Sequence, residues 1–335
     1  MQKISNYSIG IVLSCGIAMF AYLINRCLPS GFLGETLVAL LLGMCLNPII
    51  CKYDVFTSGV NWTSKYILRS GIVIAGIALS FSQVIQAGKY ALILMFFTLS
   101  TAFTVGFICR RIFNINWKLA SLLSVSTAIC GGTAVATLGP TIKASNRDIA
   151  YAISATFIFD IITVIAFPWI GRMIGLSDTG YGLWIGTAVN DTSSVVAAGY
   201  AFSDMAGSLA TIVKLTRTLF IVPIVLIFSW IVSKKESSEH TQKVNVIRIF
   251  PWFILGFLIF VGIRSTGLVP DHIVSNLSFL SKFCLSMALA AIGLKTSFKE
   301  VAGVGVKPML AGVIIDTSVV LVSLFVQALI LYFAN

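Results

Sequence analysis

Acidic and basic side chains that interrupt long apolar runs are the residues of this sequence that could do chemistry. Asp191 is the clearest, because it stands in the polar run Asn190-Asp191-Thr192-Ser193 within an otherwise apolar stretch. A charge at membrane depth is costly, so such a residue is a functional candidate by default. Asp191 is predicted to bind a proton or a cation. The alternative is a helix cap that accepts hydrogen bonds from its own Thr and Ser neighbours.

Two cations follow Asp191 in the chain. Lys214 and Arg217 are three residues apart, so they share one face of a helix. If they face a cavity, they are natural ligands for an oxyanion, and Arg217 most of all because its guanidinium presents a fork of donors. The alternatives are snorkelling to an interface, or a structural pair with Asp160 or Asp191.

Asp160 and Asp316 are further acids with apolar residues on both sides. Each could relay a proton, or form half of a structural ion pair with an intramembrane base. The sequence favours neither interpretation. With Asp191, they form the predicted set of ion-coupling residues.

Two weakened helices are predicted near these charges. The stretch 127–140 carries Gly131-Gly132 and ends in Gly-Pro, and each glycine costs a helix roughly 1 kcal/mol. A break there, or at Asn190-Asp191, would expose the N-terminus of a half-helix, whose free N–H groups favour an anion. The alternative is a tight helix crossing at small residues. The predicted substrate-binding residues are Gly131, Gly132, Thr133, Asn190, Asp191, Thr192, Ser193, Lys214 and Arg217.

The elements that must position these residues are membrane-spanning helices. The 335 residues are 58% hydrophobic and 10% charged, with a mean hydropathy of +0.98. Apolar runs long enough to cross about 30 Å of hydrocarbon recur along the whole chain. We therefore expect an all-α polytopic membrane protein with one transmembrane domain, 1–335, whose two halves are joined by a linker at 233–248. Eleven spans are predicted, at about 7–25, 32–50, 66–86, 90–109, 119–142, 149–171, 181–203, 208–232, 250–266, 273–296 and 308–333.

The distribution of charge supports this topology. With eleven spans, fifteen Lys and Arg residues fall on the side of the N-terminus and five on the other side. The positive-inside rule then places the N-terminus in the cytoplasm and the C-terminus outside a bacterial inner membrane. The net charge of +11 is explained by these loops, and the sequence shows no basic stripe typical of nucleic-acid binding.

Internal similarities indicate an inverted-repeat transporter with interrupted helices. The stretch 76–88 resembles 293–305, and the spans that contain them run in opposite directions. The stretch 127–139 also resembles 187–199. Those two stretches lie in predicted spans of the same direction, which a simple inverted pair does not explain. Chance similarity between helices rich in small residues is the alternative.

No enzyme motif or metal-ligand spacing is present in the sequence, so we expect neither an enzyme nor a metal site. No cofactor is expected beyond a coupling ion, H⁺ or Na⁺. The expected partners are membrane lipid, a small inorganic or organic anion, and a second copy of the chain in a homodimer.

The stretches 127–136, 182–200, 209–219 and 288–298 resemble the YeiH-like family of bacterial inner-membrane proteins. That family is often described as a family of sulfate exporters. The resemblance implies a secondary transporter related to the cation–proton antiporter and bile-acid transporter folds, with a panel domain and a core domain of crossed, interrupted helices. Members of that family often carry His where this chain has Asn190. The resemblance therefore implies that Asp191, rather than a histidine, carries a coupled proton here.

The expected function is secondary active transport of a small anion, such as sulfate or an organosulfonate, coupled to H⁺ or Na⁺. Lys214 and Arg217 would bind the anion together with the two half-helix ends. One alternative is a monovalent cation–proton antiporter with Asp191 as the ion ligand. Another is an uncoupled channel or a membrane scaffold.

Overall fold

A computed structural model describes residues 2–27, 35–50, 52–235, 250–296 and 306–334. Every regular element in these ranges is a helix. Six of the described helices are long and apolar enough to cross a membrane: Tyr7–Arg26, Phe81–Phe113, Asn146–Met173, Asp204–Lys234, Asp271–Lys295 and Val306–Ile330. An all-helical membrane protein is therefore confirmed, although these ranges do not establish a count of eleven spans.

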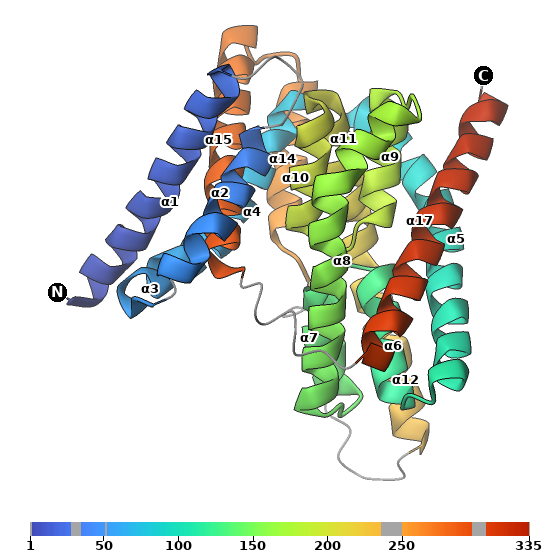
Figure 1. The fold of residues 1–335 in the computed structure, drawn as a ribbon. Helices are drawn as coiled ribbons and strands as arrows, with labels where there is room; N and C mark the ends of the chain where they lie inside the picture. The colour runs from blue at the N-terminus through green and yellow to red at the C-terminus, as the bar shows by residue number, and fades with distance from the viewer. Residues whose placement is uncertain (1, 28–34, 51, 236–249, 297–305, 335) are drawn as a thin grey trace.

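The helices fall into two lobes, which Figure 1 shows side by side. The first lobe consists of α1 (Gln2–Cys27), α2 (Glu35–Ile50), α3 (Asp54–Trp62), η1 (Thr63–Ile67), α4 (Leu68–Ala75), η2 (Gly76–Ala78), α14 (Phe253–Ser265) and α15 (Asp271–Lys295). The second lobe consists of α5 (Phe81–Phe113), α6 (Trp117–Ala128), α7 (Gly132–Thr141), α8 (Asn146–Met173), α9 (Asp178–Ala188), α10 (Thr192–Phe202), α11 (Asp204–Leu219), α12 (Ile221–Lys235) and α17 (Val306–Ala334).

The first lobe is held by close contact between α2 and α15. A methyl group placed on Gly43 would lie 2.3 Å from the carbonyl oxygen of Ala290, so only glycine permits this approach. Asn47 extends the contact by donating its amide to the carbonyl of Leu294 at 2.7 Å. The two helices run in the same direction, because the start of α2 bonds to an earlier residue of α15 than the end of α2 does.

In the second lobe, α6 and α7 form a hairpin that enters the fold and turns back. Lys118 at the start of α6 donates to the carbonyl of Lys143, just beyond the end of α7, at 2.7 Å. The chain therefore returns to the end of the molecule from which it came. The turn is at Ile129–Gly131, where α6 ends and α7 begins.

A second hairpin, α9–α10, enters from the opposite end. The hydroxyl of Tyr181 in α9 donates to the carbonyl of Ala198 in α10 at 3.2 Å, and its ring stacks on Phe202 at the end of α10. Helix α8 runs past both hairpins: its Ile153 packs beside Gly132 of the first, and its Gly171 packs against Tyr181 of the second. The two hairpins therefore point toward each other along α8 (Figure 1).

The predicted spans 119–142 and 181–203 are wrong as single crossings. Helix α6 has 12 residues and α7 has 10, so neither exceeds about 18 Å at about 1.5 Å per residue. A crossing needs about 30 Å. The expected interruptions are present, but each pair of half-helices folds back on itself, and the two pairs meet tip to tip instead of crossing.

The boundary predicted between spans 66–86 and 90–109 is also wrong. Helix α5 runs unbroken from Phe81 to Phe113 through Gly88 and Lys89. It begins at Ser80, which accepts from the N–H of Gln83 while the Gln83 side chain caps the N–H of Ser80. This capping box ends the preceding helical run, so the chain turns at Ser80 and not at the boundary predicted between residues 86 and 90. Most of the predicted linker 233–248 lies outside the described residues.

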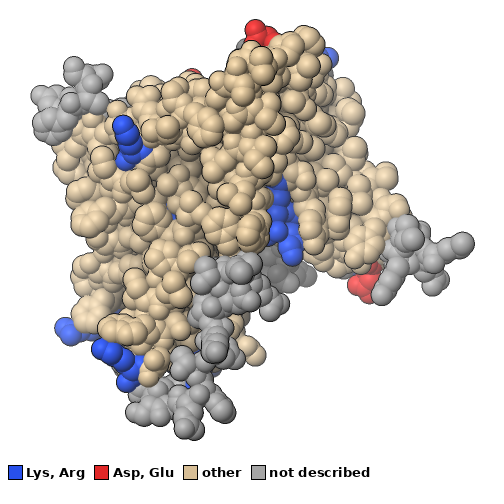
Figure 2. Space-filling view, turned by 180° about the vertical axis from the view of Figure 1, so that it is seen from behind, with Lys and Arg blue, Asp and Glu red and all other residues tan. Residues whose placement is uncertain are grey.

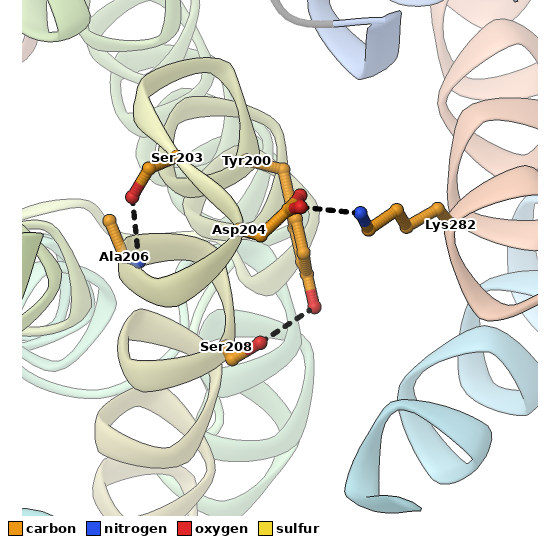
Figure 3. Close-up of polar contacts among 6 residues, drawn as sticks. All are labelled: Tyr200, Ser203, Asp204, Ala206, Ser208 and Lys282. Atoms are coloured by element: carbon orange, nitrogen blue, oxygen red, sulfur yellow. Dashed lines mark hydrogen bonds and ion pairs between the residues drawn. The ribbon is translucent and has the colours of Figure 1, made fainter. Parts of the chain in front are cut away.

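An ion pair joins the lobes at the end where the α9–α10 hairpin enters. Lys282 of α15 reaches across to Asp204 at the start of α11, with a distance of 2.6 Å between Nζ and Oδ2 (Figure 3). Ser203 caps α11 by accepting from the N–H of Ala206, which holds Asp204 in its place in the first turn. Both side chains of the pair are partly exposed.

Candidate functional site

The tips of the two hairpins meet in the middle of the second lobe. A methyl group placed on Gly131 would lie 3.5 Å from the backbone nitrogen of Asp191. Gly131 has φ 62° and ψ −133°, a conformation that glycine adopts far more readily than any other residue. The glycine therefore allows one tip to turn sharply against the other.

Lys214 and Arg217 bind the C-terminal ends of the half-helices. The Lys214 ammonium donates to the carbonyl of Ile129 at 2.7 Å and to that of Val189 at 3.0 Å, so it bridges both tips. Arg217 Nε donates to the carbonyl of Ala128 at 2.8 Å, and its two Nη groups donate to the carbonyls of Thr127 and Thr187. Both side chains are 0% exposed. These carbonyls lack partners within their helices, and the helix dipole adds negative potential there, which accounts for two buried cations.

Asp160 of α8 and Asp316 of α17 both form hydrogen bonds with the second tip. The carboxylate of Asp160 accepts from the backbone N–H groups of Asn190 and Asp191 at 3.1 and 3.2 Å. Asp316 accepts from the Asn190 amide at 2.9 Å and from the Thr127 hydroxyl at 2.5 Å. Asp316 on α17 therefore ties the two tips together. The carbonyl oxygen of the Asn190 side chain is buried and has no partner among the described residues.

The N-terminal ends of the half-helices differ between the tips. Asp191 caps α10 by accepting from the N–H of Ser193 at 2.9 Å and from its hydroxyl. Gly131 is the N-cap residue of α7, and no side chain caps that helix. The N–H of Ala134 donates to the carbonyl of Gly131 at 3.1 Å, so Gly132 and Thr133 supply the N–H groups of α7 that have no backbone partner among the described residues. One positive helix end is thus neutralised by an acid, and the other is not.

Two cavities open onto the tips between the lobes. One has a volume of about 370 Å³ and is lined by Gly132 of α7, Asp160 and Asp191. The other has a volume of about 1140 Å³ and is lined by Thr133 and, again, Asp191. Ser193 and Lys295 line both cavities. Figure 2 shows basic side chains in a hollow of the back face between the lobes, and the cations that line the larger cavity are Lys65, Arg69 and Lys295.

The structure separates the predicted site residues into two groups. One group lines the cavities: Gly132, Thr133, Asp160, Asp191, Thr192 and Ser193. The other is buried in the tips or packed against them: Gly131, Asn190, Lys214, Arg217 and Asp316. Lys214 and Arg217 line neither cavity, and their binding to an anion stays a prediction.

Sequence reasoning missed the cations of the larger cavity. Lys65 and Arg69 are four residues apart, so they occupy one face of a helix. This spacing was the feature of the sequence that could have identified them as a pair of cations. Lys295 ends α15 and donates to Ser64 at 3.4 Å, which places it beside that face. Only the packing of α15 against η1 and α4 brings the three together.

Comparison with known proteins identifies the family. Residues 9–312 match the family model described as "Conserved hypothetical protein 698". A "UPF0324 membrane protein" of Clostridium tetani is 53% identical, with 98% of each chain covered. Proteins of the same name in Streptococcus agalactiae (96% of this chain and 97% of the relative) and Streptococcus pneumoniae (98% and 99%) are 37% and 36% identical. The chain belongs to this family of membrane proteins, with which the YeiH-like resemblance agrees.

Proposed function

We propose that this member of the family is a secondary active transporter of a small anion. The observation that carries the proposal is the uncapped N-terminus of α7, which lies in the interior of the molecule and opens onto both cavities. Broken helices whose positive ends face an anionic substrate are a recurring device of secondary transporters.

The anion would bind between the tip of the α6–α7 hairpin and the first lobe. The N–H groups of Gly132 and Thr133 and the Thr133 hydroxyl supply donors, and Lys295 supplies positive charge from the first lobe. Lys65 and Arg69 extend that charge along the larger cavity. In this scheme Lys214 and Arg217 are positioning residues, because their described hydrogen bonds go to the carbonyls that define the tips.

A coupling ion, H⁺ or Na⁺, would act at the second tip. Asp191 lines both cavities and therefore places negative charge where the anion enters. Neutralisation of Asp191 by a proton or a cation would favour anion binding. By linkage, the anion would favour binding of the ion by the same factor. Asp160 and Asp316 share hydrogen bonds with the same tip and would tune this exchange.

The two lobes supply the parts that alternating access requires. The larger cavity extends from the tips to Thr141 and Phe250, at the end where the α6–α7 hairpin enters. At the other end, the Lys282–Asp204 pair joins the lobes. This arrangement is that of a transporter open to one side, and movement of one lobe against the other would exchange the sides.

The cavity would open toward the cytoplasm. Because the hairpins do not cross, Lys143 and Arg147 join the side of the N-terminus and Arg172 leaves it. Within the described residues, thirteen Lys and Arg then fall on that side and five on the other, with Lys282 of the ion pair among the five. Each of the two hairpins removes one predicted crossing, and removing two crossings leaves the rest of the chain on the sides first predicted. A cytoplasmic N-terminus and an external C-terminus in the bacterial inner membrane therefore remain our proposal.

A monovalent cation–proton antiporter is the second candidate. Three carboxylates, Asp160, Asp191 and Asp316, each bond to residues 190–193, and such a cluster could exchange a cation for protons. An antiporter would release protons when Na⁺ or K⁺ is added to the purified protein, and it would need no anion.

Uptake by proteoliposomes tests the proposal. The purified protein is reconstituted, and uptake of labelled sulfate and methanesulfonate is measured with and without gradients of H⁺ and Na⁺. Gradient-dependent uptake of an anion, reduced at least about tenfold by Lys295→Gln and unchanged by Lys89→Gln, is expected. Lys89 is exposed on α5 and lines neither cavity, so it is the matched control. Uptake of no anion would overturn the proposal, and uptake that ignores every gradient would indicate a channel.

A further inference from the structure

The smaller cavity joins a charged end to apolar walls. Its polar end holds Gly132 and Lys295, which are assigned above to the anion, and Asp160, Asp191 and Ser193, which belong to or contact the second tip. Its remaining walls come from three helices of both lobes. They are formed mainly by Leu40, Met44, Phe157, Ile161, Val164 and Leu289.

One apolar stripe of α8 runs away from the anion end. Ile153 packs beside Gly132 at 3.7 Å from the methyl position of that glycine, and Phe157, Ile161 and Val164 follow at helical spacing on the same face. Helices α2 and α15 cover the stripe from the first lobe. A ligand whose charged group lies at the α7 N-terminus would therefore find mainly apolar walls leading from it, with the Asp160 carboxyl as the acidic group on the same face of α8.

The cavity is larger than an inorganic oxyanion needs. Its volume of about 370 Å³ corresponds to about twelve groups the size of a water molecule, at about 30 Å³ each. Sulfate would fill less than half of this space and would leave the apolar walls wet. An apolar tail would remove that surface from water, a gain of about 0.8 kcal/mol for each buried methylene.

We infer that the substrate is an amphipathic organic anion: a compact sulfonate-like head group with a short apolar tail of about six to eight carbons. The head binds at the α7 N-terminus and Lys295, and the tail lies between α8, α2 and α15. This inference rests on the proposed function and specifies the substrate class of the same site.

Binding of an alkanesulfonate series to the protein in lipid nanodiscs tests the inference. The probes are inorganic sulfate and the methane-, butane-, hexane-, octane- and dodecanesulfonates, and the readout is the dissociation constant from calorimetry. Affinity should rise by about fourfold for each added methylene, up to a tail of about six to eight carbons, and should then stop rising. Equal affinity for sulfate and every sulfonate would overturn the inference but leave anion transport intact. Failure of every probe to bind would overturn the proposed function itself.

A continued rise through dodecanesulfonate would indicate a groove open to lipid, and it would also overturn the inference. Two neighbouring residues of α8 provide matched variants. Ile161 lines the cavity, whereas Ile162 is 53% exposed on the outer face. Ile161→Trp fills the cavity and should weaken hexanesulfonate at least about tenfold while leaving methanesulfonate within about twofold. Ile162→Trp should change neither constant, and equal effects of the two variants would contradict the assignment of the tail site.

Discussion

The α6–α7 and α9–α10 hairpins share a plan but differ in charge. Each breaks after a short half-helix, and the carbonyls at both breaks accept hydrogen bonds from Lys214 and Arg217. At the second tip, Asp191 caps the helix that follows and Asp160 binds two backbone N–H groups. The first tip has glycine at the same place and no cap.

The difference in capping distinguishes the hydrogen bonds that any broken helix must form from the unpaired groups that a ligand site requires. Both half-helix C-termini require hydrogen-bond donors, because unpaired carbonyls at membrane depth are costly, and here Lys214 and Arg217 supply them. The two N-termini need not be treated alike, since the one that opens onto a cavity can be satisfied by water or by an anion. The tip without its own acid is therefore the better place for an anionic substrate, and the tip with acids is the better place for a coupling ion.

The largest expected effect comes from removing the cation that both tips share. Arg217→Met leaves the carbonyls of Thr127, Ala128 and Thr187 without their donor, and such losses in a buried charge network cost about 3–5 kcal/mol. We expect a large fall in the thermal stability of the purified protein, measured by fluorescence-detection size-exclusion chromatography after heating. Arg110→Met, at an exposed position of α5, is the control. A stable Arg217→Met variant with weak anion binding would instead identify Arg217 as a ligand.

The glycine that shapes the first tip should be the next most sensitive position. Gly131→Ala forces a side chain into a backbone conformation with φ 62°, at a cost of about 1–3 kcal/mol. Gly132→Ala is matched, because its methyl would meet Ile153 at an ordinary 3.7 Å. Thermal stability should fall for the first variant alone. An equal loss of thermal stability in the two variants would show that the positive φ of Gly131 is not what shapes the first tip.

Adding an acid to the first tip should make it resemble the second. Thr133→Asp places a carboxylate in the first turn of α7, which favours the helix by about 0.3–1 kcal/mol but repels an anion. Methanesulfonate binding should weaken at least about fivefold, since a like charge nearby costs about 1 kcal/mol even in water. Thr133→Asn supplies the same shape without the charge and should bind nearly as well as the parent. Unchanged binding in the Asp variant would place the anion elsewhere.

Removing the acid from the second tip should have a smaller effect, in the opposite direction. Asp191→Asn keeps a good helix cap, so stability should change by less than about 1 kcal/mol. Loss of its charge from the cavity wall should tighten anion binding by up to about fivefold. Uptake should also lose its dependence on the H⁺ or Na⁺ gradient, which the proteoliposome assay measures. Weaker binding would mean that Asp191 contacts the substrate as a donor or through a bound cation.

Much of the fold could be predicted from residues close together in the sequence. The long apolar runs predict membrane helices, and Gly131-Gly132 and Asn190-Asp191 mark the two breaks, because these residues weaken helices wherever they occur. The similarity between 127–139 and 187–199 was visible but could not be interpreted while both were treated as crossings. The two similar stretches belong to two hairpins that enter from opposite ends of the molecule. Hairpins that enter from opposite ends are related by inversion, whereas two single crossings in the same direction would not be.

The sequence by itself determined an all-helical membrane protein, its breaks and its buried charges, since these depend on composition and local propensity. Only the tertiary structure decided that the broken helices turn back, because that depends on which ends meet, as Lys118 and Lys143 do. It also decided the hydrogen-bond partners of the charges. Lys214 and Arg217 carry the charge expected of anion ligands, and their described hydrogen bonds go to carbonyls of residues 25 to 90 positions away. A charged group at membrane depth takes whatever partner the packing brings to it, and sequence spacing does not reveal that partner.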